Sequence, residues 1–199
     1  MPSRGTLDDA SFDLVFREAH TVTSWTPEKV SNELLRRVYD LAKLGPTAAN
    51  SSPARFLFVV SKEAKEKLKP ALSPNNVDKT MAAPVNVVVG YDTQFYEFLP
   101  ELFPVNPTAR SWFEGNAKAI ESTAFRNSSL QGAYLMLAAR SLGLDCGPMS
   151  GFDAGKLEAA FWPGGRIKAN FLCNIGYGED KMQWPRGPRL PFETACQIV

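Results

Sequence analysis

Three short apolar runs limit what this chain can fold into more than any other feature. They are Phe56–Val60, Val85–Tyr91 and Phe171–Tyr177, and β-branched and aromatic residues are frequent in them. Short continuous runs of such residues are typical of buried β-strands. Segments with the period of amphipathic helices lie between the runs. The sequence therefore predicts an α+β fold in which helices pack around a small central sheet.

The helix with the clearest boundaries covers Asn32–Leu44. Ser31 is placed to cap its N-terminus, apolar residues recur along one face, and Gly45 with Pro46 ends it. Further helical patterns are an N-terminal amphipathic segment that ends at His20, then Lys62–Leu72, a helix opened by the capping-box pattern Ser111-x-x-Glu114, a long helix around Thr123–Leu142, and a helix capped by Asp153 that ends near Phe161.

Length and charge exclude several classes of protein. A chain of 199 residues matches one domain, residues 1–199, and a net charge of +1 offers no basic field for nucleic acid or anionic lipid. No apolar stretch approaches the roughly 20 residues of a membrane helix. Arg4, Asp8 and Asp9 stand where a signal peptide would place apolar residues. We therefore expect a cytoplasmic protein that binds neither membranes nor nucleic acid.

Histidine and cysteine are too scarce for several catalytic and metal sites. The chain has a single histidine, His20, and three cysteines without a Cys-x-x-Cys pair. A Ser-His-Asp hydrolase would depend on that one histidine, and the cysteines fit neither a structural zinc site nor a disulfide framework. We expect no metal site and three ordinary thiols.

Two proline-rich segments are each compatible with more than one structural role. Residues 96–107 combine aromatic side chains with Pro100, Pro104 and Pro107, which fits both a lid over an apolar ligand and a loop packed down by its own rings. The tail Trp184–Pro191 contains three prolines, which lack an N–H donor, so it is predicted to form neither a helix nor a central strand. We expect it to cross a surface, either its own or that of a partner subunit.

Three segments, taken in order, resemble the FMN-dependent nitroreductase family. They are Gly45–Pro53 before a predicted strand, Leu142–Asp153 after the long helix, and Asn174–Gly178 followed by Pro188–Pro191. Shorter matches are most similar to the malonic semialdehyde reductase subfamily, at Ala54–Arg55, Leu72–Ser73, Pro100–Pro104, Ala109–Phe113 and Thr123–Ser129. The resemblance spans nearly the whole chain.

The resemblance implies an interwoven homodimer with a mostly antiparallel sheet and two FMN sites at the subunit interface. FMN then carries the chemistry at its N5 atom, so no side chain has to act as a catalytic acid or base. NADH or NADPH is the implied hydride donor, and a small-molecule substrate takes its place in a ping-pong reaction. For the subfamily, that substrate is malonic semialdehyde, reduced to 3-hydroxypropionate. A nitroaromatic or quinone reductase and a non-catalytic flavin-binding protein are the alternatives.

The resemblance also assigns residues to FMN. Gly151 falls where the family places a backbone N–H against N5, and Asn50 matches an amide at the pyrimidine edge of the ring. Arg189 matches a tail arginine that pairs with the phosphate, and Arg186 can assist it. Three residues would lie against one face of the ring: Pro148, Met149 and Ser150. Without the resemblance, these residues are equally typical of a turn, a capping amide and surface arginines.

One family motif is largely missing from this chain. The phosphate motif Arg-x-Ser-x-Arg/Lys-x-aromatic aligns with Ala19–Trp25, where both basic positions are lost and only Thr21 and Trp25 match. His20 and Arg17 are the available substitutes. We assign His20 and Thr21 to the cofactor, with a position at a helix end as the alternative role of His20.

A substrate with a carboxylate needs a cation, because burying an unpaired charge is strongly unfavourable. Arg110 is our candidate, since it adjoins Trp112 and Phe113 in a segment that resembles the subfamily. Arg55 and Arg126 are alternatives, and so is an exposed loop arginine without a ligand. An apolar pocket lined by Trp112 and Phe113 would instead favour a nitroaromatic or quinone substrate.

Overall fold

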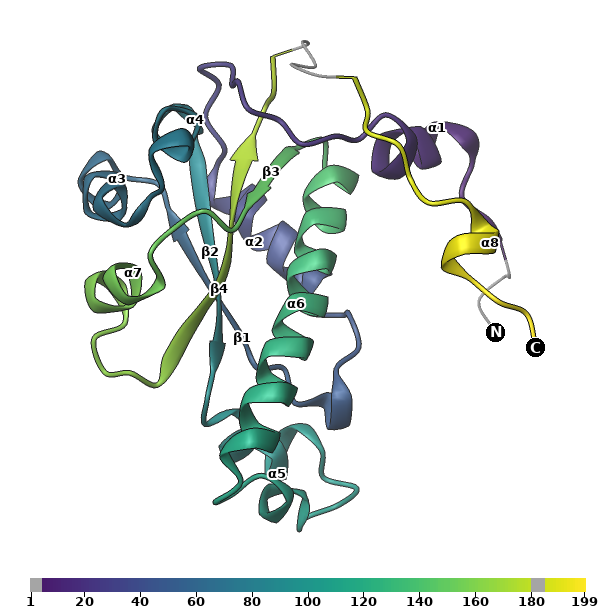
Figure 1. Cartoon of the computed structure of the whole chain (residues 1–199), viewed down its shortest axis with the longest axis vertical. Coiled ribbons are helices and arrows are strands. Elements are labelled where there is room, and N and C mark those ends of the chain that lie inside the picture. The colour runs from purple at the N-terminus through teal and green to yellow at the C-terminus, as the bar shows by residue number, and fades with distance from the viewer. Residues whose placement is uncertain (1–4, 180–184) are drawn as a thin grey trace.

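A four-stranded antiparallel sheet forms the centre of the computed structural model, which describes residues 5–179 and 185–199. Trp184, the first residue of the predicted tail, lies outside the described residues. The strands lie in the order β1-β2-β4-β3, as Figure 1 shows. Their bounds are β1 Ala54–Val59, β2 Val85–Asp92, β3 Asp145–Met149 and β4 Ile167–Gly176. The predicted α+β fold with a small antiparallel sheet is confirmed.

Helices cover both faces of this sheet (Figure 1). On one face, α2 (Asn32–Ala42) and α6 (Ala117–Ser141) enclose a core that includes Val38, Val87 and Leu135. On the other face, α3 (Lys62–Leu68) and α7 (Ala154–Phe161) enclose a second core, and α4 (Val77–Ala82) lies beside them. Each fully buried aliphatic side chain contributes about 1.5–3 kcal/mol to folding. All residues of β2 are buried, because this strand has neighbours on both sides and helices on both faces.

The three predicted apolar runs correspond to β1, β2 and β4, but the sequence did not predict β3. β3 contains Gly147 and Pro148, which interrupt the run of strand-forming residues in the sequence, and proline has no N–H to donate to a sheet. β3 tolerates Pro148 because it is an edge strand of the sheet: β4 is its one neighbouring strand, and the isolated bridge to Thr21 is made at Cys146. The segment expected to form only a turn therefore begins as a strand.

The predicted helix that begins after Ser31 is confirmed, with the Ser31 hydroxyl oxygen accepting from the Leu34 N–H at 3.1 Å. The predicted capping box is wrong. Ser111 lies in a short 3₁₀ turn, Ala109–Trp112, where its hydroxyl donates to the carbonyl of Thr108. In place of two helices, one long helix begins at Ala117, six residues before the predicted start at Thr123, and is capped by the side chain of Asn116.

Residues 96–107 pack against a small core of their own. A 3₁₀ turn, Phe95–Phe98, leads into the short helix α5 (Leu99–Leu102). Phe95 and Leu99 are fully buried there. Their neighbours in this cluster include Tyr91, Ala109, Phe113 and Ala124. In one protomer, this segment is a loop packed down by its aromatic residues.

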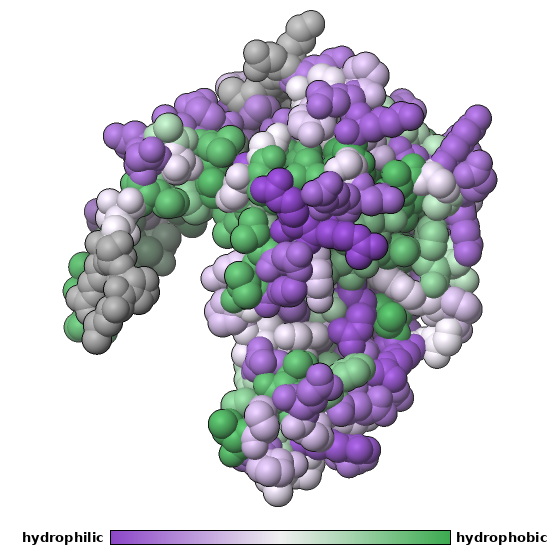
Figure 2. Space-filling model, turned by 180° about the vertical axis from the view of Figure 1, so that it is seen from behind, coloured by the Kyte–Doolittle hydropathy of each residue, from purple (hydrophilic) through white to green (hydrophobic). Residues whose placement is uncertain are grey.

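The two ends of the described chain form an arm that projects from the body (Figures 1 and 2). The arm contains α1 (Asp9–Phe12), a π-helical turn at Asp13–Arg17, and the tail with α8 (Phe192–Ala195). As predicted, residues 185–191 form neither a helix nor a strand. Apolar residues remain exposed on the arm, among them Leu14, Phe16, Leu190 and Phe192. No helix in the described part of the chain is long and apolar enough to cross a membrane.

Candidate functional site

A cavity of about 520 Å³ lies where the arm joins the body. It is formed by the N-terminal segment, the last turn of α6 and the tail. Of the predicted site residues, His20, Thr21, Arg186 and Arg189 all line it. None of the described lining residues is acidic, so the cavity concentrates positive charge. The other lining residues are Phe16, Ala19, Thr23, Arg140, Pro185 and Gly187.

Backbone contacts hold the walls of this cavity together. The Arg186 guanidinium donates to the carbonyls of Arg17 and Ala19, at 2.5 and 2.8 Å, and so ties the tail to the N-terminal segment. That segment is in turn attached to the sheet, because Thr21 forms a β-bridge with Cys146 in β3. Two regions far apart in the sequence are thereby brought to one end of the sheet.

The two proposed substitutes for the missing basic residues have different surroundings. His20 lines the cavity, with its Nδ1 atom 3.0 Å from the carbonyl oxygen of Glu18. The Arg17 guanidinium instead pairs with Asp9 and Asp13, at 2.9 and 3.0 Å, and does not line the cavity. Sequence reasoning missed Arg140, because a basic residue in the last turn of a helix usually needs no explanation beyond the helix dipole.

The second group of predicted residues lies at the end of β3. The Gly151 carbonyl accepts from the Ser73 N–H at 3.0 Å and from the Asn76 amide at 2.8 Å. A Cβ at Gly151 would come within 2.5 Å of the Asn76 amide nitrogen, so this close contact requires glycine. Sequence reasoning also missed Asn76, because its partner is distant in the sequence. The loop of Pro148, Met149, Ser150 and Gly151 is thus held by residues that precede α4.

Buried polar groups hold the side chain of Met149 from behind. The hydroxyl of Thr80, which is fully buried, donates to the Met149 sulfur at 3.5 Å. Asn86 donates to the Thr80 carbonyl and to the side-chain oxygen of Asn174, each at 2.8 Å. Since a buried polar group that lacks a partner is costly, these bonds limit how far the loop can move.

Asn50 lies in a different part of the protomer. It follows Ala49 in a turn where Ala49, Asn50 and Ser52 all have positive φ, between 40° and 52°. Its amide donates to the Leu102 carbonyl at 2.8 Å, which leaves the side-chain oxygen available as an acceptor. Asn50 lines a groove of about 1120 Å³ between α2 and β1.

The candidate substrate residues surround the start of α6. The Arg110 side chain is 47% exposed and pairs with Glu114 at 2.7 Å. Trp112 is 48% exposed beside Phe103. Phe113 is instead buried, with its ring centroid 4.9 Å from that of Phe95, so in one protomer it belongs to the core.

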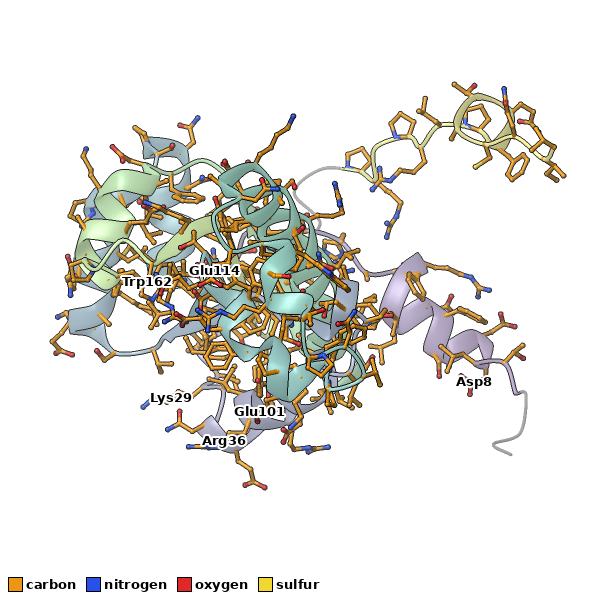
Figure 3. All side chains as sticks on the ribbon, turned by 90° about the horizontal axis from the view of Figure 1, so that it is seen from below. Asp8, Lys29, Arg36, Glu101, Glu114 and Trp162 are labelled. Atoms are coloured by element: carbon orange, nitrogen blue, oxygen red, sulfur yellow. The ribbon has the colours of Figure 1, made fainter. Side chains whose placement is uncertain are left out.

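The predicted site residues therefore do not meet within one protomer. α6 is 25 residues long, so its ends lie about 37 Å apart. The cavity adjoins its last turn, whereas Arg110 and Trp112 precede its first turn. Figure 3, seen from below, shows the arm with Asp8 to one side of the body that carries Glu101 and Glu114. A site that uses both groups requires a second chain.

Among the residues that the structure describes, no group of three or more His, Cys, Asp or Glu side chains could hold a metal ion. Cys146 and Cys173 are buried free thiols and Cys196 is exposed. A hydrogen bond with the Cys146 thiol, together with burial, raises the pKa of Cys173 well above its usual value. Since the thiolate is the reactive form, Cys173 is chemically inert at neutral pH.

Comparison with known proteins gives a consistent result. The model of the nitroreductase family matches residues 17–177. A Burkholderia lata protein named "Putative NADH dehydrogenase/NAD(P)H nitroreductase" is 58% identical over 193 residues, which cover 97% of this chain and 98% of the relative. A Ralstonia nicotianae protein with the same descriptive name is 55% identical over 194 residues, which cover 98% of this chain and 99% of the relative.

Solved structures share the fold. A Bacillus subtilis protein, described as the "putative nitroreductase" YdfN, gives a TM-score of 0.85 at 23% identity, covering 96% of this chain and 100% of that chain. An Exiguobacterium sibiricum protein, described as a "putative nitroreductase in complex with FMN", gives a TM-score of 0.84 at 24% identity, covering 99% of this chain and 100% of that chain. The predicted nitroreductase-like fold is confirmed.

Proposed function

The chain belongs to the nitroreductase family, and from that premise we propose that it is a homodimeric FMN-dependent oxidoreductase. It takes reducing equivalents from NADH or NADPH and delivers them to a small electron-poor molecule. The names of two close relatives, which include NAD(P)H nitroreductase, support this activity.

The cavity beneath the arm carries the proposal. Its lining combines three arginines, a histidine and the hydroxyl of Thr21, without a carboxylate among the described residues. Guanidinium groups bind phosphate through paired hydrogen bonds, and a hydroxyl adds a further donor. These residues fit the phosphate of FMN, with Arg186 and Arg189 contributed by the tail.

The loop from Pro148 to Gly151 is proposed to lie against the flavin ring. When bound, FMN supplies the redox chemistry, since it can accept and release a hydride. The chain then has to bind and orient the ring and keep water from it. Ser73 and Asn76 fix the Gly151 carbonyl from one side. The backbone N–H of Gly151 has no acceptor among the described residues, and it is proposed to face the ring. A chain with one histidine is sufficient for such a reaction, because no side chain has to transfer the hydride.

The division of the site supports a homodimer. The phosphate cavity and the Gly151 loop are proposed to come from one chain, and Asn50 from its partner. Exposed apolar side chains on the arm and on α6 are suited to burial between two chains, among them Phe16, Leu190, Phe192, Phe125 and Tyr134. Figure 2 shows such apolar surface on the arm and on the body that it faces.

Malonic semialdehyde is the proposed substrate, on the basis of the sequence segments that resemble its reductases. Its carboxylate would take the place of Glu114 as the partner of Arg110. A specific observation favours a second candidate, a nitroaromatic or a quinone: Trp112 is half-exposed beside Phe103, and aromatic surfaces bind flat apolar rings.

Steady-state kinetics test the proposal. The initial rate is measured while NADH or NADPH and the second substrate are varied together, with malonic semialdehyde, a nitroaromatic and a neutral quinone as substrates. Ping-pong kinetics with at least one of these substrates are expected. Arg110→Ala should lower kcat/KM for malonic semialdehyde about tenfold or more and spare the quinone. Lys118→Ala, another exposed cation near the start of α6, is the control.

The outcomes test the proposed substrate and the proposed oxidoreductase activity separately. Equal losses on both substrates would assign Arg110 a structural role, and no loss on either would favour the aromatic substrates. Protein that binds FMN but turns over neither reduced nucleotide would be a flavin-binding protein without activity, and the oxidoreductase proposal would be wrong.

A further inference from the structure

Arg140 is an unusual arginine in this structure. Three arginines of the described chain are half-buried: Arg55, Arg140 and Arg166. Arg55 and Arg166 both donate to Asp92. The Arg140 side chain has no hydrogen bond or ion pair with any residue that the structure describes. Since a partly desolvated guanidinium without a partner is unfavourable, a partner beyond the described residues is expected.

The end of α6 does not explain this arginine. A basic residue in the last turn can cap free carbonyls, but here the backbone already does so. Leu142 and Gly143 donate their N–H groups to the carbonyls of Ala138 and Arg140, and Leu144 donates to Ala139. Gly143 has a φ of +78°, the left-handed conformation that commonly ends helices. The Arg140 side chain is therefore not needed to end the helix.

The position of Arg140 points to its ligand. It lines the cavity beneath the arm, together with Arg186 and Arg189 of the tail. Arg186 is bound to backbone carbonyls of the N-terminal segment, and Arg189 donates to carbonyls of its own tail at 2.9 and 3.3 Å. Among the described residues, Arg140 is thus the cavity arginine whose guanidinium has no hydrogen-bond partner, and it is carried by the 25-residue helix α6.

We propose that Arg140 binds the phosphate of FMN and replaces the basic residues that the segment Ala19–Trp25 lacks. This inference rests on the proposed function. The ligand it predicts is the dianionic phosphate monoester, and the rest of the flavin is not required for the contact. Three guanidinium groups from two separate elements then surround the phosphate, with Arg140 fixed by α6 and the other two carried by the tail.

Paired titrations with FMN and riboflavin test the inference, because the two ligands differ only in the phosphate. Binding to the flavin-free, full-length protein is followed by quenching of flavin fluorescence. The variants are Arg140→Ala, the charge-retaining Arg140→Lys, and the control Lys118→Ala, which removes an exposed cation from the same helix. Circular dichroism and Tm verify that each variant is folded.

Arg140→Ala should weaken FMN binding about tenfold or more, as expected for one charge-assisted contact, and leave riboflavin binding unchanged. Arg140→Lys should recover part of the loss, and Lys118→Ala should bind both ligands like the wild type. Inorganic phosphate should compete with FMN in the wild type more strongly than in Arg140→Ala.

Three results would overturn the inference or its premise. Unchanged FMN binding in Arg140→Ala would remove Arg140 from the site, while the wild type would still support the proposed function. Equal losses of affinity for FMN and riboflavin would show that Arg140 has a structural role. If Arg140→Ala does not fold, the same comparison is made with Arg140→Lys. A wild-type protein that binds no FMN would overturn the proposed function itself.

Discussion

Asp92, at the end of β2, is a buried charge that connects three parts of the chain. Its side chain is 2% exposed and accepts from Arg55 at 2.6 Å and from Arg166 at 2.8 and 2.9 Å. Burial alone would raise the pKa of Asp92, but the hydrogen bonds from Arg166 and the Gln94 N–H, with the charge of Arg55, lower it overall. The guanidinium groups of Arg55 and Arg166 also lie over the ring of Phe98.

Asp92→Asn should therefore destabilise the fold. The variant leaves the partly buried Arg55 guanidinium without a negative partner among the described residues and Arg166 with Glu97 alone, which costs about 2–3 kcal/mol once their partial solvation is allowed for. Urea unfolding at pH 7 measures the difference. Asp78→Asn is the control, since Asp78 is exposed and has no ion pair among the described residues.

The lowered pKa of Asp92 also predicts how the stability difference between wild type and Asp92→Asn depends on pH. Because the pKa of Asp92 is lower in the folded chain, its stabilisation is fully present above the pKa of the unfolded state, about 3.9. It is lost as the pH falls through the folded pKa. The gap between wild type and Asp92→Asn should therefore narrow below about pH 4. Equal stability of the two proteins at pH 7 would contradict this role.

At the scale of elements, α6 holds the strained turn that carries Asn50. The Asn127 side chain, which is almost fully buried, accepts from the Ala48 N–H at 2.8 Å. Gln131, one turn further along, accepts from the Ala54 N–H at the same distance. Residues with positive φ other than glycine persist only where surrounding contacts hold them. The two amides supply such contacts on either side of the turn.

Gln131→Met should accordingly loosen this turn. Methionine is similar in size but accepts poorly, so the Ala54 N–H would stay buried and unpaired at a cost of about 1–3 kcal/mol. Lys118→Met places the same residue on an exposed position of α6 and should leave the free energy of unfolding nearly unchanged. Hydrogen exchange at Ala54 provides the second measurement. Unaltered exchange in Gln131→Met would show that α6 does not hold the turn.

The sequence was most informative where local pattern and tertiary structure agree. Apolar runs predicted β1, β2 and β4, and Ser31 with Gly45 bounded α2 closely, because caps and periodicity act over a few residues. β3 was not predicted because its proline is tolerated only at a sheet edge, and the sequence does not reveal which strand lies at the edge. The Ser111 capping box failed because a 3₁₀ turn uses that hydroxyl differently.

The site was predictable only in part, and for a related reason. The resemblance supplied His20, Thr21, Arg186 and Arg189, which the structure brings to one cavity. Asn76 and Arg140 were missed because their significance comes from contacts with distant segments. Asn76 donates to Gly151, and Arg140 lines the same cavity as the tail arginines. Such relations become visible only once the chain is folded.

At the scale of the whole molecule, the division of the site along α6 predicts a homodimer in which each chain completes the other's site. Light scattering should show a dimer at micromolar concentration, and a monomer would contradict the proposal. Complementation is the more specific test. Arg189→Ala removes a cation from the phosphate cavity. Asn50→Gly removes the amide and, since glycine adopts positive φ freely, keeps the turn.

Each variant alone should bind FMN weakly, because both sites of its dimer carry the same defect. When the two variants are co-expressed, mixed dimers contain one site with both defects and one intact site. A fraction of tight FMN sites should therefore appear in the mixture. A mixture that binds FMN like the average of the separate variants would contradict a shared site.

The central claim is that this chain holds FMN and exchanges electrons with a reduced nicotinamide nucleotide. The absorption spectrum of the purified protein, recorded before and after anaerobic addition of NADH or NADPH, tests it most directly. We predict the bands of oxidised flavin, released as FMN on denaturation, and their bleaching by at least one nucleotide. A colourless protein that takes up no added FMN, or flavin bands that neither nucleotide bleaches, would contradict the account.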